Sequence, residues 1–543
     1  MYLKLLQKTL SYEYFLVIFL IFISFLLPSL FPVYFRMDDA LWLYMVSTNS
    51  LFDILLPFKG IIFGLYKPVI NLIWFFNYRL WGINPYMYQL LLNLLFFGSL
   101  FFFYKFLKEV FDNNIATIFP FCFLAIFTDF LYILFWFSDY TFTTELFFMS
   151  LSLFLFFSGF KKNKFRIFLG YICMILAFFS KDPSVVIIPV VLFTYFIFHP
   201  KKIHPFKNKF HEILFLTIIA LTVICYLMFF FTGKTRMDVS YNIAMFVKRG
   251  LFYTRELTKG IRGIVTLIAL MYLIINKFSH KHILNFLGSI ILLIGFKYLN
   301  VQHIVIILFL IILFFVRKEL RFAVAWILSI FSGLLTISFL NKTYLLELVF
   351  GLNIIICFFI YSIFQDFYLL YKEKQKYSLY FKTLSIISIL IVSLVAIKIS
   401  HSYLQNLERL VSVRATFKEA VNYIINSIPF SSTVYILEYE DLGFKGRTDI
   451  RLRTMPMQKK IEIQKTMDRY YLQKFLKVLG RKDIKVKKIS KIREKIKEPK
   501  YIFIYNDFEY NKFVTMNLRI KFKELICIKN KCNKAYIYKV LNY

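Results

Sequence analysis

Cysteines and acidic residues are both scarce in this chain, which has only 6 Cys and 31 Asp and Glu among its 543 residues. So few cysteines exclude a disulfide-rich scaffold. Cys527 and Cys532 flank a predicted turn, and a disulfide between these two stays open. The other four lie within apolar runs, where small core side chains are expected: Cys122, Cys173, Cys225 and Cys357.

The shortage of acidic residues leaves a formal net charge of +36, because the chain has 67 Lys and Arg. Such an excess can indicate a nucleic-acid-binding protein. Here, however, the basic residues lie mostly in the connections between apolar runs and in the region after residue 400. This distribution is typical of membrane topology and of contact with lipid phosphates. We therefore expect membrane lipid, and no nucleic acid, as a partner.

The chain also lacks an internal repeat, a low-complexity linker and a signal-peptide cleavage site. Its first apolar segment, 14–31, is longer than the apolar part of a signal peptide, so we interpret it as a retained helix. What the chain has in abundance is hydrophobic residues, at 59%, including 70 Phe. Apolar stretches of membrane-spanning length recur along it, which predicts a multi-pass integral membrane protein of the cell or inner membrane.

Apolar runs of about 17 to 25 residues are long enough to cross a bilayer as helices. Taking each run as one helix predicts a mainly α-helical membrane protein with about thirteen transmembrane helices in a domain over residues 1–400. The predicted helices cover 14–35, 85–104, 115–136, 142–160, 166–180, 184–198, 212–232, 261–276, 283–297, 300–316, 322–340, 344–364 and 383–400.

The positive-inside rule orients these helices, because short cytoplasmic connections are rich in Lys and Arg. With the N-terminus inside, every predicted inner connection is basic: KFLKEVFDNN, KKNKFR, HPKKIHPFKNK, NKFSHKH, RKELR and YKEKQKYSLYFK. An odd number of helices then places the end of the chain outside. The basic stretch 485–500 fits the cytoplasm better by composition, which leaves a twelve-helix alternative open.

The region from His401 to the end lacks long apolar runs and has a different pattern. TVYILEY, KYIFIYN and KAYIYKV are β-rich segments bounded by polar turns. Between them, 457–480 has helical spacing and ends at Gly480, a residue that commonly stops a helix. We predict a small α/β domain over 401–543 on the extracytoplasmic side.

Acidic residues gather at the predicted outer ends of the first six helices, where an ionised group avoids the hydrocarbon. They are Asp38, Asp39, Asp129, Asp139, Glu145 and Asp182. For Asp129 and Glu145, helix capping or contact with headgroup water is the better interpretation. It does not explain Asp38 and Asp39, because adjacent carboxylates raise each other's pKa unless a cation or hydrogen-bond donors offset the repulsion. Such a pair is typical of a functional site.

Basic residues are predicted on the same side: Arg36, Lys67, Arg79 and Lys181 near the helix ends, and Arg249, Arg255 and Arg262 in a long outer loop. That loop is partly apolar, so it can lie at the membrane interface and hold an anionic headgroup. Simple contact with anionic lipid is an equally good interpretation.

These residue types suit transfer of a sugar from a polyprenyl phosphate. The phosphate leaves as a stable anion, so it requires positive charge but no general acid. One carboxylate then suffices, as the base that removes the proton of an acceptor hydroxyl. A single displacement of this kind inverts the anomeric carbon, and it does not need the second carboxyl group that glycoside hydrolases use as an acid.

Three segments resemble the C-type glycosyltransferase superfamily, and within it the protein O-mannosyltransferase-like branch, which includes enzymes with tetratricopeptide repeats. The segments are DDALWLYMVSTN at 38–49, YKPVINLIWFFNYRLWGINPYMYQLLLN at 66–93 and SKDPS at 180–184. The resemblance covers about the first 200 residues. It implies a multi-spanning fold that uses polyprenyl-phosphate sugars, with amphipathic helices in the first outer loop.

By this resemblance Asp38 is the catalytic base and Asp39 its partner, while Lys67 and Lys181 help to place either the phosphate-bearing donor or the acidic pair. The whole substrate site is expected to comprise Arg36, Tyr66, Lys67, Arg79, Asp139, Lys181 and Asp182, with Arg249, Arg255 and Arg262 near the phosphate. Pro68 and Pro85 predict helix starts, and Gly82 a turn.

The chain departs from the pattern of that branch at three positions. Lys67 stands where Arg is usual, Gln89 where His is usual, and Asp182 where Glu is usual. Because Lys cannot form the two parallel hydrogen bonds that Arg forms with phosphate, the donor's identity stays open. The region after residue 400 shows no tetratricopeptide pattern, so the acceptor can be a protein, a lipid or a glycan.

Two other functions remain as alternatives. A polysaccharide polymerase or ligase with a diphosphate-linked donor would depend on basic residues of a large outer loop. A secondary transporter or flippase would place ionisable residues near the membrane midplane and repeat its hydropathy pattern. An adjacent Asp pair can hold Mg2+ or Mn2+, but the monophosphate-sugar branch generally works without a metal, so we expect no cofactor other than the lipid-linked donor.

Overall fold

The computed structural model describes most of the chain, with gaps. The described residues are 2–31, 33–35, 39–56, 61–62, 65–111, 113–137, 140–162, 164–181, 184–198, 243–258, 260–278, 288–292, 302–336, 345–373, 401, 404–405, 407–408, 411, 414–437, 469–489, 492, 498–504, 513, 521–530 and 533–542.

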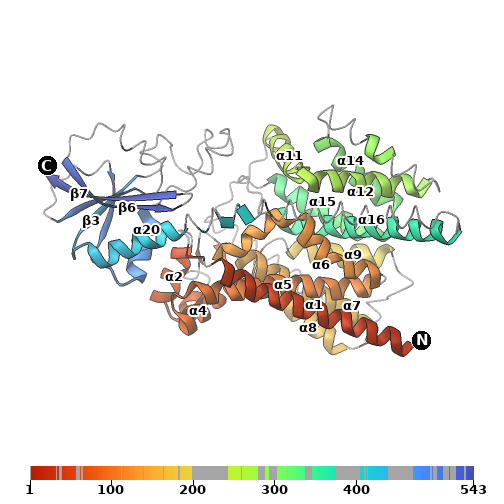
Figure 1. The fold of residues 1–543 in the computed structure, drawn as a ribbon. Coiled ribbons are helices and arrows are strands. Elements are labelled where there is room, and N and C mark those ends of the chain that lie inside the picture. The colour runs from red at the N-terminus through yellow and green to blue at the C-terminus, as the bar shows by residue number, and fades with distance from the viewer. Residues whose placement is uncertain are drawn as a thin grey trace.

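A bundle of long helices that lie side by side makes up the larger part of the molecule (Figure 1). Its helices are α1 (Tyr2–Leu30), α5 (Pro85–Val110), α6 (Asn113–Ile126), α7 (Tyr140–Lys162), α8 (Lys164–Phe178), α9 (Ser184–Phe198), α11 (Ile243–Leu257), α12 (Gly260–Phe278), α14 (Gln302–Val316), α15 (Arg321–Thr336) and α16 (Leu346–Glu373). Two short 3-10 helices, η1 (Thr128–Phe135) and η3 (Lys318–Leu320), connect them.

Four helices of the described part are long and apolar enough to cross a membrane: Tyr12–Leu30, Pro85–Val110, Tyr140–Phe160 and Leu346–Gln365. The pair Val247–Leu257 and Arg262–Lys277 also passes as a span, although it is bent by 95°. These helices indicate an integral membrane protein, while the predicted number of about thirteen is not confirmed. Two predicted helices, 212–232 and 383–400, lie outside the described residues, as does most of 283–297.

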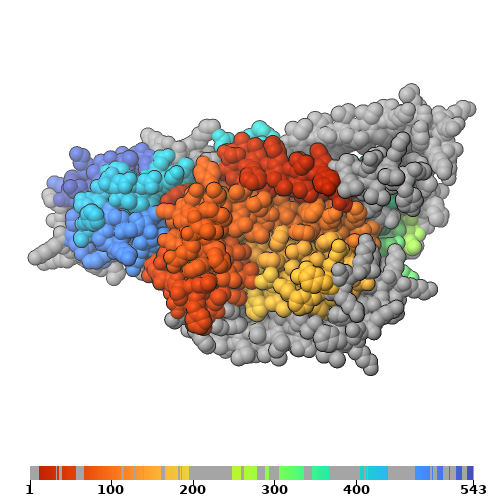
Figure 2. Space-filling view, turned by 90° about the horizontal axis from the view of Figure 1, so that it is seen from below, coloured from red at the N-terminus to blue at the C-terminus, as the bar shows by residue number. Residues whose placement is uncertain are grey.

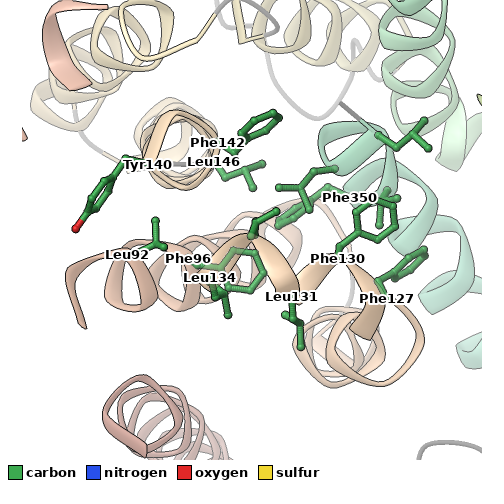
Figure 3. Packing of buried hydrophobic residues seen from close by; sticks show 14 of the residues in the cluster. Leu92, Phe96, Phe127, Phe130, Leu131, Leu134, Tyr140, Phe142, Leu146 and Phe350 are labelled. Atoms are coloured by element: carbon green, nitrogen blue, oxygen red, sulfur yellow. The ribbon is translucent and has the colours of Figure 1, made fainter. Parts of the chain in front are cut away.

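Aromatic rings fill the centre of the bundle. Phe103 of α5 stacks on Phe119 of α6 with ring centroids 5.2 Å apart, and lies 4.9 Å from Phe350 of α16 and 5.5 Å from Trp326 of α15. Figure 3 shows the neighbouring part of this core, with Phe350 near Phe130 of η1. Such contacts add to simple burial and connect α5 and α6 with α15 and α16, which come much later in the chain.

The predicted single helix over 115–136 was wrong in its second half. The α-helix ends at Ile126, and η1 follows as a 3-10 helix. Phe127, Phe130 and Ile133 recur every three residues and all are buried. Because a 3-10 helix has three residues per turn, this spacing points the three side chains into the core on one face.

The connection between α1 and α5 folds against one end of the bundle (Figure 1). It contains α2 (Asp39–Thr48), α3 (Leu51–Leu55), a two-stranded hairpin of β1 (Ile61–Ile62) and β2 (Leu65–Tyr66), and α4 (Pro68–Trp81). Helix α4 buries Ile70 and Trp74 but exposes Leu80, so it is amphipathic as predicted for this loop.

The predicted roles of two prolines and a glycine in this region are confirmed. Pro68 and Pro85 stand at the first positions of α4 and α5. Gly82 has a φ of +57°, and its N–H donates to the Tyr78 carbonyl at 2.8 Å, which ends α4. Only glycine adopts this conformation without strain, so the chain can turn sharply into α5.

The C-terminal part forms a five-stranded sheet with strand order β4-β3-β5-β7-β6. The strands are β3 (Thr433–Ile436), β4 (Lys485–Lys488), β5 (Lys500–Ile504), β6 (Lys521–Asn530) and β7 (Asn533–Asn542). Strand β3 is parallel to both β4 and β5, whereas β7 is antiparallel to β5 and β6. The three β-rich segments predicted from the sequence are thus confirmed as β3, β5 and β7.

Two helices cover one face of this sheet: a helix over 414–427 and α20 (Arg469–Val478). The helix predicted over 457–480 is confirmed for the length of α20, and Gly480 follows it with a φ of +87°. Residues 457–468 lie outside the described part. The predicted domain boundary at 400/401 adjoins another such stretch, 374–400.

The sheet and its helices pack against the end of the bundle that carries α2 and α4 (Figure 1). Seen from below, the blue C-terminal part lies directly against the orange-red surface of the α1–α5 connection (Figure 2). Helix α20 packs on α2. The C-terminal domain and the first predicted outer loop therefore lie on the same side of the bundle.

Arg481 joins the helix over 414–427 to the sheet. Its guanidinium donates to the carbonyls of Ile424 and Pro429 and to both carboxylate oxygens of Asp483, at 3.0 to 3.2 Å. These carbonyls lie at the C-terminal end of the helix, where no further helical turn supplies N–H donors for them. Because Arg481 and the Ser431 N–H both donate to Asp483, its pKa is lowered from the usual 3.8.

We predict that Asp483→Asn destabilises the domain at neutral pH but not in acid. The folded state lowers the pKa of Asp483, so its contribution to stability is fully present above pH 3.8 and is lost as the pH falls through the folded-state pKa. Calorimetry should find a lower melting temperature for the variant at neutral pH, and the two proteins should converge well below pH 3.8. Glu524→Gln, on the exposed edge strand β6, is the control. A constant difference at all pH values would contradict the assignment.

Candidate functional site

Asp39 is the first residue of α2 and is fully buried at the end of the bundle. The amino end of a helix carries partial positive charge, which favours an ionised carboxylate at this position. The carboxylate is also near enough to the phenols of Tyr88 and Tyr140 to interact with both electrostatically. Asp38 and Arg36 lie outside the described residues.

A hydrogen-bonded network joins these two phenols to three helices. The Tyr140 hydroxyl, at the start of α7, donates to the backbone carbonyl of Tyr88 in α5. The side-chain amide of Asn77 in α4 donates to the Tyr140 oxygen at 3.0 Å. The Tyr88 hydroxyl in turn donates to the Gly82 carbonyl at 2.9 Å. The network fixes the ends of α4, α5 and α7 relative to one another.

Stacked aromatic rings complete the surroundings of Asp39. Trp42 of α2 stacks on Trp74 of α4, with ring centroids 5.9 Å apart and planes 9° from parallel. Trp74 also contacts Tyr88 and Tyr140 at 5.3 and 5.8 Å. The two phenols that interact with Asp39 are therefore part of a closely packed group of aromatic side chains.

Lys181, which precedes α9, lies in a second buried cluster of charges. Its ammonium pairs with Glu347 at the start of α16 and with Glu145 of α7, 3.8 Å away, and lies 3.3 Å from the centre of the Phe142 ring. All three charged side chains are almost completely buried. Glu145 also accepts from the Ser184 N–H at 2.7 Å, so it caps α9. The cluster joins α7, α9 and α16.

The two clusters lie on opposite sides of α7. Tyr140 leaves the helix on one side, whereas Phe142 and Leu146 leave it on the other (Figure 3). Side chains two positions apart on an α-helix point in directions that differ by about 200°. The divergence of Tyr140 and Phe142 is therefore a consequence of helix geometry. The structure therefore brings Asp39 and Lys181 to the same end of the bundle but places the first helical turns of α7 between them.

The three arginines predicted near the donor phosphate come from α11 and the start of α12. Arg249 is buried and donates to the Leu335 carbonyl at 2.7 Å, near the end of α15. Arg262 is also buried, with its guanidinium 4.9 Å from the centre of the Phe130 ring in η1. Arg255 is exposed. In this structure Arg249 and Arg262 thus contact helix ends, and Arg255 faces outward.

The remaining candidates are placed only in part. Lys67 is half-buried and precedes α4 as its N-cap residue. Arg79 is exposed at the end of α4, with its guanidinium 5.0 Å from the Phe75 ring. Tyr66 belongs to β2, and only its backbone is described. Asp139 and Asp182 lie outside the described residues. Within the described ranges, no group of three or more His, Cys, Asp or Glu could hold a metal ion.

Sequence reasoning missed Glu347 and assigned Glu145 only a possible capping role. Glu347 is the one charged side chain in the predicted span 344–364. A charged residue within an apolar span marks a functional site by default, so this signal was present in the sequence. Its partner could not be identified from the sequence, because Lys181 is 166 positions away.

We predict that Lys181→Met destabilises the bundle by about 3–5 kcal/mol, because it leaves two buried carboxylates without their cation. Adding Glu347→Leu should restore part of this loss. Unfolding in detergent, compared between the single and double variants, is the measurement.

Lys105→Met is the matched control for this prediction. Lys105 pairs with Glu13 at 2.6 Å, but Lys108 pairs with the same carboxylate and both ammoniums are partly exposed. We expect the control to change stability by about 1 kcal/mol or less. Equal losses for Lys181→Met and Lys105→Met would show that the buried cluster has no special role.

No model of a known protein family matches the chain, and no curated protein sequence matches it. Two solved structures of ArnT from Cupriavidus metallidurans resemble it in fold. The structure bound to undecaprenyl phosphate is 12% identical, with a TM-score of 0.50 over 97% of this chain and 98% of that one. The apo structure is 11% identical, with a TM-score of 0.50 over 98% of both chains.

At this identity the likeness concerns the fold alone. It extends over the bundle and the C-terminal domain together, since almost all of both chains is covered. The C-type glycosyltransferase superfamily expected from the sequence therefore stays a proposal. The narrower O-mannosyltransferase-like branch is not confirmed.

Proposed function

We propose that this protein is an integral-membrane glycosyltransferase. It transfers a sugar, such as the hexose of the O-mannosyltransferase-like branch, from a polyprenyl-phosphate carrier to a hydroxyl group of a protein, lipid or glycan. The transfer takes place at the extracytoplasmic face and inverts the anomeric carbon in one displacement.

The observation that carries this proposal is the shared fold with ArnT over nearly the whole of both chains. One of those ArnT structures is bound to undecaprenyl phosphate, which is a polyprenyl phosphate. A ligand of the same class for the present chain agrees with the acidic pair and the basic residues that the sequence shows. Fold alone does not imply function, so the site residues have to carry the chemistry.

In the proposed reaction, Asp38 accepts the proton of the acceptor hydroxyl as that oxygen attacks the anomeric carbon. The bond from this carbon to the phosphate oxygen breaks at the same time, and the phosphate keeps the electron pair. Asp39 positions Asp38, because its own carboxylate is fully buried and has no exposed surface with which to meet an acceptor. The negative charge of Asp39 also favours transfer of the proton to its neighbour.

The departing phosphate gains negative charge, which nearby cations stabilise. Lys67, Arg79 and Arg255 are the candidates whose described side chains keep exposed surface. Arg249 and Arg262, which are buried, would act at longer range by holding α15 and η1 in place. The donor is the only cofactor that this mechanism uses.

We assign the reaction to the extracytoplasmic face from the distribution of charge. At the far end of the bundle from α2, Lys105 and Lys108 meet Glu13, near the basic connections predicted as cytoplasmic. The C-terminal domain shares the opposite end with Asp39. The positive-inside rule then places that end outside.

We predict that Asp38→Asn lowers turnover by about a hundredfold or more, because a general base contributes 10²- to 10⁴-fold. Asp39→Asn should lower it as well, since Asp39 positions the base. The measurement is transfer of radiolabelled sugar from a polyprenyl-phosphate donor by purified protein. Inversion is read from the anomeric configuration of the product.

Asp53→Asn is the control, because Asp53 belongs to the same connection but lies in the first turn of α3, where Ser50 donates to it at 2.9 Å. It should keep normal turnover. Normal transfer by Asp38→Asn would refute the base and would favour a polymerase or ligase that depends on basic residues. Accumulation of a transported solute without transfer would favour the flippase.

We predict that an impermeant thiol reagent added outside intact cells labels Cys527, which is partly exposed on β6. Labelling is measured by mass spectrometry after mild reduction, so a disulfide to Cys532 would not hide the thiol. A Cys527→Ser variant identifies the labelled peptide. Labelling only after the cells are opened would place the domain in the cytoplasm and contradict the proposed face.

A further inference from the structure

The C-terminal domain packs against the residues that precede the acidic pair. Phe475 of α20 contacts Tyr34 with ring centroids 5.8 Å apart and Phe35 at 6.4 Å. Phe417, from the helix over 414–427, stacks on Phe475 at 5.9 Å and contacts Tyr34 at 6.3 Å. Burial in this cluster raises the pKa of Tyr34 to about 12. The rings enclose the backbone three to five residues before Asp38 and Asp39.

The same domain also packs against the residues that follow the acidic pair. The ammonium of Lys474 lies 3.6 Å from the centre of the Tyr44 ring in α2. Helix α20 packs along α2, so Lys474 and Phe475 touch the segment on both sides of the acidic pair.

Phe35 connects the contacts made by Phe475 to Tyr88, which interacts with Asp39. Its ring is fully buried and lies 5.1 Å from Tyr88 and 5.1 Å from Phe137 in the bundle. Tyr88 is one of the two phenols that interact electrostatically with Asp39. One ring therefore contacts the C-terminal domain through Phe475 and the wall of the candidate site through Tyr88.

Helix α2 is too short to hold this arrangement by itself. It has 10 residues, and isolated helices shorter than about 12 to 15 residues are marginal in water. Its position therefore depends on its packing partners, which are α4 on the side of the bundle and α20 on the side of the C-terminal domain. A reacting group displaced by about 1 Å can lose about a hundredfold in rate.

From these contacts we infer that α20 is a clamp on the segment 33–48, and that Phe475 and Lys474 are positioning residues for the acidic pair. The C-terminal domain is then a part of the catalytic scaffold in addition to any role in acceptor binding. This inference rests on the proposed function for its kinetic effect, but the clamp itself is a structural property that can be measured independently.

The first experiment measures hydrogen exchange in the peptides that cover 33–48, by mass spectrometry of the full-length protein in detergent. Phe475→Ala should speed exchange in this segment by about tenfold or more, because it removes the ring that holds Tyr34 and Phe35. Phe513→Ala is the matched control, since Phe513 is buried in the same domain but on the opposite face of the sheet. It should leave exchange in 33–48 unchanged.

The second experiment measures donor-to-acceptor transfer by the same variants. Phe475→Ala should lower kcat by about tenfold or more while the KM for the donor changes by less than about threefold, because the base is misplaced and the donor contacts remain. Lys474→Met should show a smaller loss of the same kind. Lys477→Met, one helical turn further along α20, should show none.

The outcomes separate the clamp from the proposed function. Equal exchange and equal kcat in Phe475→Ala and Phe513→Ala would overturn the clamp. Faster exchange with unchanged kcat would overturn the positioning role of Phe475. If Phe475→Ala does not fold, the pair Lys474→Met and Lys477→Met decides the question by the same two measurements. Faster exchange in a protein that has no transferase activity even as the wild type would support the clamp and refute the proposed function.

Discussion

The start of α7 is the constraint on which the rest of the candidate site depends. On one side of it, Tyr140 is bound to α5 through the Tyr88 carbonyl and to α4 through Asn77. On the other side, Glu145 pairs with Lys181 and caps α9. Because α7 also packs along α5 and α8, the two clusters are attached to one rigid element. A site built on helix ends in this way is held more precisely than a site on loops.

Buried charge at this end of the bundle is matched by specific partners. Lys181 has two carboxylates and an aromatic ring, and Arg249 has a carbonyl near the end of α15. An unpaired charge in a protein surrounded by lipid is expensive, so such residues first serve the packing of helix ends. Because these buried cations already have partners within the protein, fewer cations are left to bind a substrate. The half-buried Lys67 and the exposed Arg79 and Arg255 keep exposed surface, which the buried arginines do not.

Much of the fold could be predicted from local pattern. Apolar runs marked the positions of α1, α5 and α7, and alternating β-rich segments marked β3, β5 and β7, because both signals are carried by neighbouring residues. The prediction failed at 115–136, where an apolar run alone cannot distinguish a continuous helix from the 3-10 turn of η1. For the site, the side of the bundle was predictable for Asp39 and Lys181, since both lie at helix ends. Their separation by α7 was not.

The sequence by itself determined that the chain is a helical membrane protein with a small α/β domain, and that acidic and basic residues gather at one end of its helices. Hydropathy and charge patterns are carried by neighbouring residues, so they can be read directly from the sequence. Only the tertiary structure decided which charges meet and which helices pack against α2. Lys181 and Glu347 are 166 positions apart, and Tyr34 accepts a hydrogen bond from Arg414, 380 positions away. Contacts over such distances arise from the packing of whole elements, which leaves no trace in the residues around each partner.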